Sequence, residues 1–253
     1  MTVKNTVLKN VIQGLTAVAF LLGVWWLAYA LAENPLVVPS PWKSLWTAVL
    51  LFGKGAFYYA LWTTFLRVVI AFLVAFVLGV FFALVAYLYP AFGGFFGKIV
   101  SFLRSLPVLA VLLVLLVGFG ADKAPVAVSF LSLFPILYSG FLSGLKELDP
   151  SLAEMSRAYG VPLKTRVCKW YLPALAPFAL RESGSAIAFG LKLTVSAEIL
   201  ANTYKSLGGM MQEARTFLEG ETLFALVIVA FLLAMALESV FSATANAVER
   251  RTK

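Results

Sequence analysis

The chain contains no histidine and only one cysteine, Cys168, among its 253 residues. Without histidine it cannot form histidine-ligated metal sites, Ser-His-type catalytic triads or histidine proton relays. One cysteine cannot form an intrachain disulfide, so cysteine usage indicates no redox compartment. No aspartate lies within any of the long apolar stretches either. We therefore predict no catalytic residue and no metal site in this chain.

Charge is also scarce. Only 13% of the residues are charged and 62% are hydrophobic, against about 25% charged and 45–50% apolar in an ordinary soluble domain. This composition indicates a polytopic membrane protein. The net charge of +8 comes from scattered basic residues, which fits the positive-inside rule better than nucleic-acid binding. The first apolar run, from Val11, is long enough to remain as a span, so no cleavable signal peptide is evident.

Six apolar stretches reach the roughly 20 residues that a bilayer core requires. They lie near 11–32, 60–89, 97–119, 124–145, 173–201 and 222–246. Backbone groups in lipid must be hydrogen-bonded within the chain, so these stretches predict helices. The sequence thus predicts an all-α membrane protein with six transmembrane helices in a single domain, 1–253.

The segments between these stretches are short. Residues 118–125 form a tight turn that makes the third and fourth stretches antiparallel. Residues 34–42 are a proline-punctuated connector, and Pro41 then opens a short helix over about 41–53. Residues 203–220 are too polar to span and are predicted to lie at the surface.

Orientation follows from the placement of lysine and arginine. With the N-terminus inside, eleven basic residues fall on inner segments and five on outer ones. The inner set is Lys4, Lys9, Lys98, Lys146, Arg157, Lys164, Arg166, Lys169, Arg250, Arg251 and Lys253; the outer set is Lys43, Lys54, Lys123, Lys205 and Arg215. This asymmetry predicts that both termini and the loop 146–172 are cytoplasmic.

A polar island, 147–170, interrupts the lipid-soluble chain inside that loop. Asp149-Pro150-Ser151 is a helix start, and Ser151 with Glu154 three residues later fits a capping box. Gly160 stands where a helix ends in the left-handed conformation, and Pro162 and Pro173 suit the first turns of the next helices. We interpret the island as a helix-Gly-helix module whose apolar side chains, Met155 and Tyr159 among them, bind a partner. The alternative is a capped surface helix that only joins two spans.

The island resembles the cytoplasmic loop of ABC importer permeases. That signature runs Glu-Ala-Ala, three residues, Gly, nine residues, Ile, any residue, Leu-Pro, and Glu154, Gly160, Leu172 and Pro173 match its spacing. Met155 and Ser156 replace the alanines and Trp170 the isoleucine. Further landmarks, at 38–41, 63–67, 103–107, 118–120 and 134–136, resemble permeases of the nitrate, sulfonate, taurine and thiamine-precursor importers. After Leu106-Pro107 the chain departs from the family, since residues 108–117 are nearly all aliphatic.

The resemblance implies the type I importer permease fold in a bacterial cytoplasmic membrane. It implies that Glu154, Met155, Ser156, Tyr159, Gly160 and Pro173 dock on a separate ATP-binding subunit. This chain has no Walker A sequence and no cofactor of its own, so ATP would be bound and hydrolysed by that partner. An extracytoplasmic binding protein would deliver a small polar nutrient, either a thiamine-pyrimidine-like heterocycle or an oxyanion such as sulfonate or nitrate. A second permease copy would complete the central path.

Charges inside the predicted spans mark candidate path residues, because each costs about 3 kcal/mol near the bilayer centre. Lys192 either lines a polar path or is a buried partner of an acid on another span. By the family resemblance, Glu198 in Ser196-Ala197-Glu198 occupies the position of a recurrent acid. Arg67 is either a path residue or one that snorkels or packs. The roles of Arg181 and Glu182 stay open.

Three rival classes of membrane protein explain the sequence less completely. An ion-gradient-driven transporter or channel explains Lys192 and Glu198 but not the loop. An energy-coupling-factor scaffold also docks ATPases, through Ala-Arg-Gly-type motifs that this sequence does not show. An intramembrane enzyme lacks the residues for catalysis.

Overall fold

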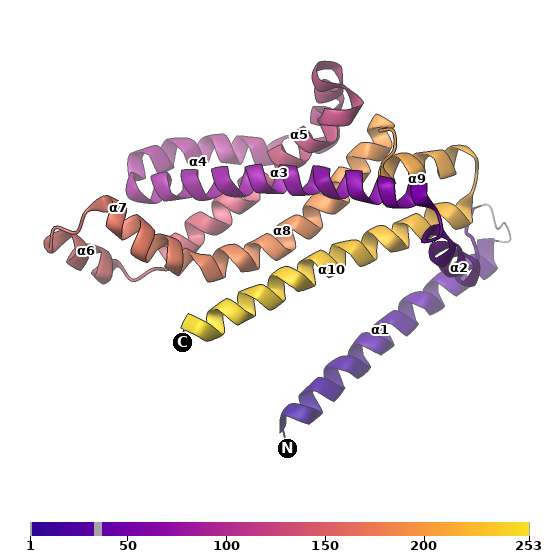
Figure 1. Ribbon diagram of the computed structural model, residues 1–253, viewed down its shortest axis with the longest axis horizontal. Helices are drawn as coiled ribbons and strands as arrows, with labels where there is room; N and C mark the ends of the chain where they lie inside the picture. The colour runs from indigo at the N-terminus through magenta and orange to yellow at the C-terminus, as the bar shows by residue number, and fades with distance from the viewer. Residues whose placement is uncertain (1, 33–36, 253) are drawn as a thin grey trace. The chain divides into compact units, whose positions relative to one another are not determined.

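The computed structural model describes residues 2–32 and 37–252, and these form helices and short connections without a β-strand (Figure 1). The predicted all-α class is confirmed. In chain order the helices are α1 Thr2–Ala32, α2 Pro41–Leu51, α3 Gly55–Leu88, α4 Pro90–Ser105, α5 Val108–Lys146, α6 Pro150–Ala158, α7 Leu163–Arg166, a π-helical turn Val167–Tyr171, α8 Leu172–Ala201, α9 Leu207–Thr216 and α10 Gly220–Thr252. The predicted helix after the proline connector begins at Pro41 as expected, whereas residues 34–36 of the connector lie outside the described residues.

Within the described residues, five helices are long and apolar enough to cross a membrane, against six predicted spans. They are Ile12–Ala32, Gly55–Leu88, Val108–Lys146, Leu163–Ala201 and Gly220–Ala245. All the predicted stretches except 97–119 fall on these helices. Three agree with the helix bounds within a few residues, and the helices 108–146 and 163–201 begin ten or more residues before the predicted stretches. The prediction of a continuous helix over 97–119 is wrong.

The break in that stretch is at Leu106-Pro107. Helix α4 ends at Ser105, Leu106 is extended with φ −68° and ψ 129°, and α5 begins at Val108. Proline has no N–H to donate and disfavours helical backbone in the residue before it, so the helix is interrupted here. The turn predicted at 118–125 is present, because Gly120 has φ 73° and ψ 173° and divides α5 into 108–119 and 121–146. Few residues other than glycine adopt that conformation.

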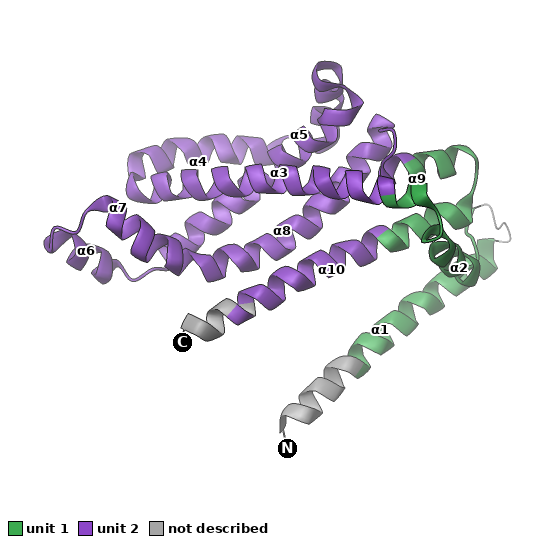
Figure 2. Cartoon of the chain, viewed as in Figure 1, with its two compact units in different colours: residues 1–58, 210–229 green, residues 59–209, 230–253 purple. Residues whose placement is uncertain are grey.

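The chain forms two compact units (Figure 2). Unit 1 comprises residues 1–58 and 210–229, and unit 2 comprises 59–209 and 230–253. In unit 1, Lys43 and Glu221 form an exposed ion pair at 3.4 Å and the rings of Trp25 and Phe224 stack. Unit 2 holds the loop 146–172 and all the candidate path residues, so the functional analysis concerns unit 2. The single-domain prediction stays a prediction.

In unit 2, helices α5 and α8 pack as a close antiparallel pair. Ser129 and Thr194 share a buried hydrogen bond of 2.8 Å between their hydroxyls. Further along, Leu133 lies against Gly190 and Phe178 against Gly144. Positions rise along α5 as they fall along α8, which defines an antiparallel register. Small residues at the contact let the two backbones approach closely, as expected for helices packed in lipid.

Aromatic rings fill the other side of α5. Phe96 of α4 stacks on Phe82 of α3 with 4.6 Å between ring centroids, and Phe134 and Tyr138 of α5 meet Phe96 edge to face. Helices α3 and α4 therefore lie side by side, as Figure 1 shows. Phe92 also stacks on Phe82 of α3, whereas Phe95 is exposed.

We predict that Gly144→Val destabilises unit 2. A Cβ there would lie 3.0 Å from Cγ of Phe178, and overpacking of this kind costs about 1–3 kcal/mol. The thermal unfolding midpoint of the purified chain should fall. Gly94→Val on α4 is the control, since a Cβ there meets nothing within 4 Å. Equal midpoints for the two variants would contradict the packing.

Candidate functional site

Helix α6 of the loop is capped by Asp149. Its Oδ1 accepts hydrogen bonds from the Ser151 backbone N–H at 2.9 Å and from the Ser151 hydroxyl at 2.7 Å. These two bonds, the hydroxyl's first, lower the pKa of the Asp149 carboxyl. The predicted Ser151–Glu154 capping box is therefore wrong. Asp149 and Ser151 are both residues that cap helices well. Asp149 takes the cap position because Pro150 has no N–H and suits the first helical position directly after it.

Gly160 ends α6 in the left-handed conformation, with φ 69°. Its N–H donates to the Arg157 carbonyl, and the Val161 N–H donates to the Ser156 carbonyl, each at 3.0 Å. This pair of bonds is the Schellman motif, which satisfies the last carbonyls of a helix and turns the chain sharply. The predicted helix end at Gly160 is confirmed, with its hydrogen bonds.

The loop presents apolar side chains to solvent. Tyr159 is 82% exposed and Met155 52% exposed, and Glu154 is exposed beside them. Ser156 is half-buried and its hydroxyl donates to the Ala153 carbonyl at 2.8 Å, whereas Pro173 lies exposed in the first turn of α8. An exposed tyrosine and methionine on a rigidly capped helix form a surface suited to a protein partner.

The loop is joined to α8 without a flexible link. Helix α7, the π-helical turn and α8 form one helical run, Leu163–Ala201, so the separate helix predicted at Pro173 is the continuation of the one that follows Pro162. Tyr171 in the π-helical turn is fully buried and meets Tyr87 of α3 edge to face at 5.4 Å. The segment after Gly160 and α8 therefore belong to one helical run, which Tyr171 packs against α3.

At the far end of α8 lies Glu198, which has no exposed surface. Its Oε1 lies 3.0 Å from Nη1 of Arg67, and its Oε2 accepts the Gly208 N–H at 3.1 Å. The Thr64 hydroxyl lies 3.0 and 2.8 Å from the two carboxylate oxygens, and it accepts the Leu207 N–H at 2.9 Å. A buried carboxylate is tolerated only when it is paired and hydrogen-bonded in this way.

We call this set the latch: Thr64, Arg67, Glu198, Leu207 and Gly208. It joins α3 to the end of α8 and to the first turn of α9, whose free N–H groups favour a carboxylate. The two glycines that follow Leu207 permit the approach, because a Cβ on Gly208 would collide with Cβ of Glu198 and one on Gly209 with the Thr203 carbonyl. The latch holds the connection between α8 and α9 in place.

Arg67 also reaches the turn after Gly120. Its Nε donates to the Asp122 carbonyl at 3.3 Å, and Nη2 lies 3.4 Å from the Asp122 carboxylate. Asp122 is 79% exposed, so this second ion pair contributes little to stability. Thr203 donates to the neighbouring Ala121 carbonyl at 2.9 Å, which fixes the same turn of α5 to the end of α8.

Of the three predicted path residues, Lys192 is the exposed one. Arg67 and Glu198 are directed to each other, and neither presents an open polar surface here. Lys192 has no ion pair within the described parts of the chain, so the buried-pair interpretation does not fit. Its neighbours on the same face are Ser185, Phe189 and Ser196, all exposed, and at about 100° per residue they lie within one narrow stripe.

Arg181 and Glu182 lie nearer the loop. Arg181 is exposed on the same stripe of α8. Glu182 is half-buried and its carboxylate lies over Gly140 of α5, where a Cβ would be 2.9 Å from Cγ of Glu182. The glycine thus leaves room for an acidic side chain inside the helix pair.

Sequence reasoning missed two features of this site. Thr64 and the amides of residues 207 and 208 complete the Glu198 site, and no local pattern indicates the contact between Thr64 and Glu198, which are 134 residues apart. Arg104 lines a cavity between α4, α5 and α8. The sequence could have indicated Arg104 as a candidate, because it is the one arginine in the stretch predicted to span at 97–119.

The family follows from comparison with known proteins. The model of the family described as "Binding-protein-dependent transport system inner membrane component" matches residues 75–253. The chain belongs to that family. It is a multi-pass ABC transporter permease, and the resemblance drawn from the loop signature is confirmed.

Curated relatives of this permease cover most of its length. The "Taurine transport system permease protein TauC" of Escherichia coli K12 is 26% identical over 242 residues, which is 91% of this chain and 88% of TauC. A "Probable ABC transporter permease protein" of Brucella melitensis is 28% identical over 91% of this chain and 94% of its own. The "Putative aliphatic sulfonates transport permease protein SsuC" of E. coli K12 is 29% identical over 60% of this chain and 56% of SsuC.

Solved structures give the fold. Inward-facing structures of the MetNI methionine ABC transporter match this permease with a TM-score of 0.67 at 16% identity, over 75% of this chain and 94% of that one. An amino acid ABC transporter matches with a TM-score of 0.60 at 18% identity, over 78% and 93%. The predicted type I importer permease fold is confirmed.

We predict that Arg67 and Glu198 are energetically coupled. Replacing Arg67 by methionine leaves a buried carboxylate without its cation, which costs about 3–5 kcal/mol. The Arg67→Met variant should unfold at a markedly lower temperature, and Arg67→Met with Glu198→Met should recover much of that loss. Thermal unfolding of the four members of this cycle measures the coupling. Additive effects would show that the latch does not act as a unit.

Proposed function

We propose that this permease forms the translocation path of an ATP-driven importer for a small polar nutrient and docks on a separate ATPase through its loop. The observation that carries the proposal is the exposed Met155 and Tyr159 on a helix fixed at both ends, by Asp149 and by Gly160. Such a helix suits a groove in a partner protein. Glu154 and Pro173 belong to the same docking segment by their match to the family signature, and Ser156 belongs to it by its position within the segment.

In this mechanism ATP binding closes the partner subunits and moves the docked loops. The continuous run Leu163–Ala201 carries that movement to the latch. The permease then switches between an inward-open and an outward-open packing, and nucleotide biases the two. ATP is bound by the partner, and the permease contributes no catalytic group and no metal or cofactor.

The path itself runs along the exposed stripe of α8. Ser185, Lys192 and Ser196 are polar and exposed along α8, and a charge facing lipid near the bilayer centre costs about 3 kcal/mol. A second permease copy that faces this stripe would enclose a polar path between the two. A homodimer would supply that second copy from the same gene product. Arg67 and Glu198 then close the end of the path.

The named relatives suggest the substrate class. TauC is a taurine permease by name and SsuC an aliphatic sulfonate permease, so we propose a small sulfonate-like oxyanion in preference to a thiamine-pyrimidine-like heterocycle. An extracytoplasmic binding protein would deliver it. Both termini and the loop would lie on the cytoplasmic side of the bacterial inner membrane, where the basic residues accumulate.

We predict that Gly160→Val uncouples the permease from its ATPase. A β-branched residue at φ 69° costs on the order of 1–2 kcal/mol and redirects α7. Substrate-stimulated ATPase activity and coupled uptake by the reconstituted complex should fall while the permease still inserts. Gly160→Asn is the control, because asparagine tolerates this conformation. Unchanged coupled uptake by Gly160→Val would remove the loop from the mechanism.

We predict that Lys192→Met lowers transport but not assembly. The substitution removes an expensive charge from a membrane-spanning helix, and no described carboxylate pairs with it. The amount of purified complex and its basal ATPase activity should be retained while uptake falls several-fold. Lys54→Met, at an exposed position outside the path, controls for the loss of charge. Wild-type uptake by Lys192→Met would exclude this residue from the path.

A further inference from the structure

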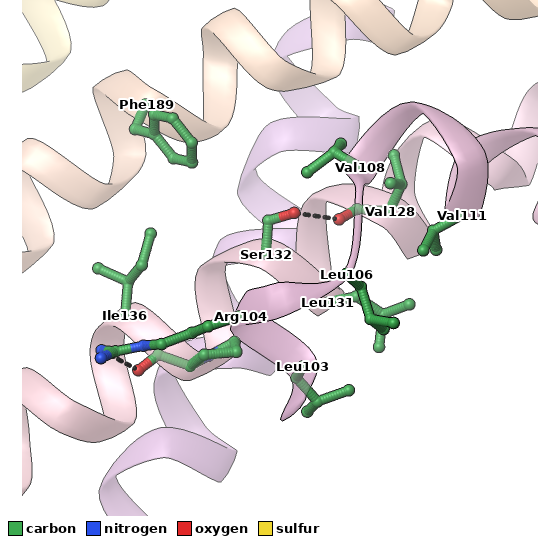
Figure 3. A pocket seen from close by; sticks show the side chains of 11 residues that line it. Leu103, Arg104, Leu106, Val108, Val111, Val128, Leu131, Ser132, Ile136 and Phe189 are labelled. Atoms are coloured by element: carbon green, nitrogen blue, oxygen red, sulfur yellow. Dashed lines mark hydrogen bonds between the residues drawn. The ribbon is translucent and has the colours of Figure 1, made fainter. Parts of the chain in front are cut away.

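Arg104 is a cation that neither the latch nor the loop uses. Arg104 is in the last turn of α4, and its Nη2 donates to the Pro135 carbonyl of α5 at 3.1 Å (Figure 3). Within the described residues Arg104 makes this one hydrogen bond, and no described carboxylate pairs with it. A guanidinium carries five N–H donors, so most of them are available to a ligand.

Arg104 lies far along the chain from the start of α4 and from Gly120. It follows Pro90 by 14 residues, which is about 21 Å of helix, and a further helical piece, 108–119, of about 18 Å separates it from the turn at Gly120. The hydrocarbon core is roughly 30 Å thick. Because the side chain is exposed in the single chain, it must face water, protein or a ligand.

Arg104 borders a cavity of about 170 Å³. Leu103, Leu131 and Ile136 give it apolar walls, and Phe189 of α8 lies across from them (Figure 3). Ser132 is the other side chain with a polar group, and its hydroxyl donates to the Val128 carbonyl at 3.0 Å. No acidic residue lines the cavity. Pockets for drug-sized ligands measure roughly 300–1,000 Å³, so this one suits a smaller molecule.

We propose that Arg104 binds the charged head of a small organic anion, a sulfonate or carboxylate with a short apolar chain, during its passage. The planar guanidinium matches two oxygens of such a head group, and Phe189 with the aliphatic side chains covers the chain. Phe189 and Lys192 are three residues apart on one face of α8, so the cavity adjoins the path stripe. The assignment rests on the proposed function and specifies its substrate class.

Direct binding tests the proposal. The permease is purified with its ATPase partner in nanodiscs of zwitterionic lipid, and binding of butanesulfonate and of uncharged 1-butanol is measured by saturation-transfer NMR. Butanesulfonate should bind the wild type and butanol should not. Arg104→Gln should raise the half-saturating butanesulfonate concentration roughly ten- to hundred-fold, the usual effect of losing a charge-assisted hydrogen bond.

Two matched variants distinguish the effect of a cation in the cavity from that of a cation elsewhere on α4. Lys98→Gln removes an exposed cation from the same helix, six residues earlier, and should bind butanesulfonate as the wild type does. Arg104→Lys keeps the charge without the planar fork and should bind more weakly than the wild type. If Arg104→Gln fails to assemble, Arg104→Lys decides, and unchanged binding by that variant overturns the proposal.

The remaining outcomes are also decisive. If the wild type does not bind butanesulfonate, or binds it equally with and without Arg104, the anion site is wrong. ATP-dependent uptake by the reconstituted complex with its binding protein is measured in parallel. Uptake without Arg104-dependent binding leaves the proposed function standing and removes the anion site, whereas a complex with no ATP-dependent uptake of any solute would overturn the proposed function itself.

Discussion

A charged group inside a bilayer must be neutralised by its neighbours or must reach water, and this permease uses both solutions on one helix. At one end of α8, Glu198 is fully buried and is held by Arg67, Thr64 and the Gly208 amide. In the middle, Lys192 is exposed and has no described ion-pair partner. The first arrangement fixes α8 to α3 and α9. The second requires that something other than lipid covers the helix.

The same helix connects the two functional ends. Leu163–Ala201 is one helical run of 39 residues, about 58 Å at 1.5 Å per residue, from the segment after Gly160 to the latch. The antiparallel partner α5 follows it through glycine and serine contacts that leave little freedom to slide. The loop and the latch therefore lie at opposite ends of one helical run.

Much of this was readable from the sequence. The apolar stretches predicted the helices, because length and hydropathy alone decide membrane insertion, and Gly160 predicted the helix end, because a left-handed residue favours glycine. The interrupted third stretch was less accessible. Pro107 was visible, but it lies inside a stretch, 97–119, that is long and apolar enough to be predicted as one span. The helix cap was assigned to Ser151 instead of Asp149 because both residue types cap helices well, and only the structure shows which of them does so.

The site was harder to predict than the fold. Charges in spans identified Lys192, Glu198 and Arg67, and the sequence could not show that two of them are partners, because the pair joins positions 131 residues apart. Burial distinguishes them, since Glu198 has no solvent access and Lys192 is exposed on the same helix. Arg104 was visible as a lone arginine in the stretch 97–119, and the structure adds the cavity that it lines.

The central claim is that the polar stripe of α8 faces an aqueous path in the assembled complex. Single cysteines at Ser185, Lys192 and Ser196, in a Cys168→Ser background, can be tested with a charged, water-soluble thiol reagent. Val77, which is 62% exposed on α3 within an apolar segment, is the lipid-facing comparison, and buried Thr194 is the packed one. The account predicts labelling at 185, 192 and 196 but not at 77 or 194; stripe positions as unreactive as Val77 would contradict it.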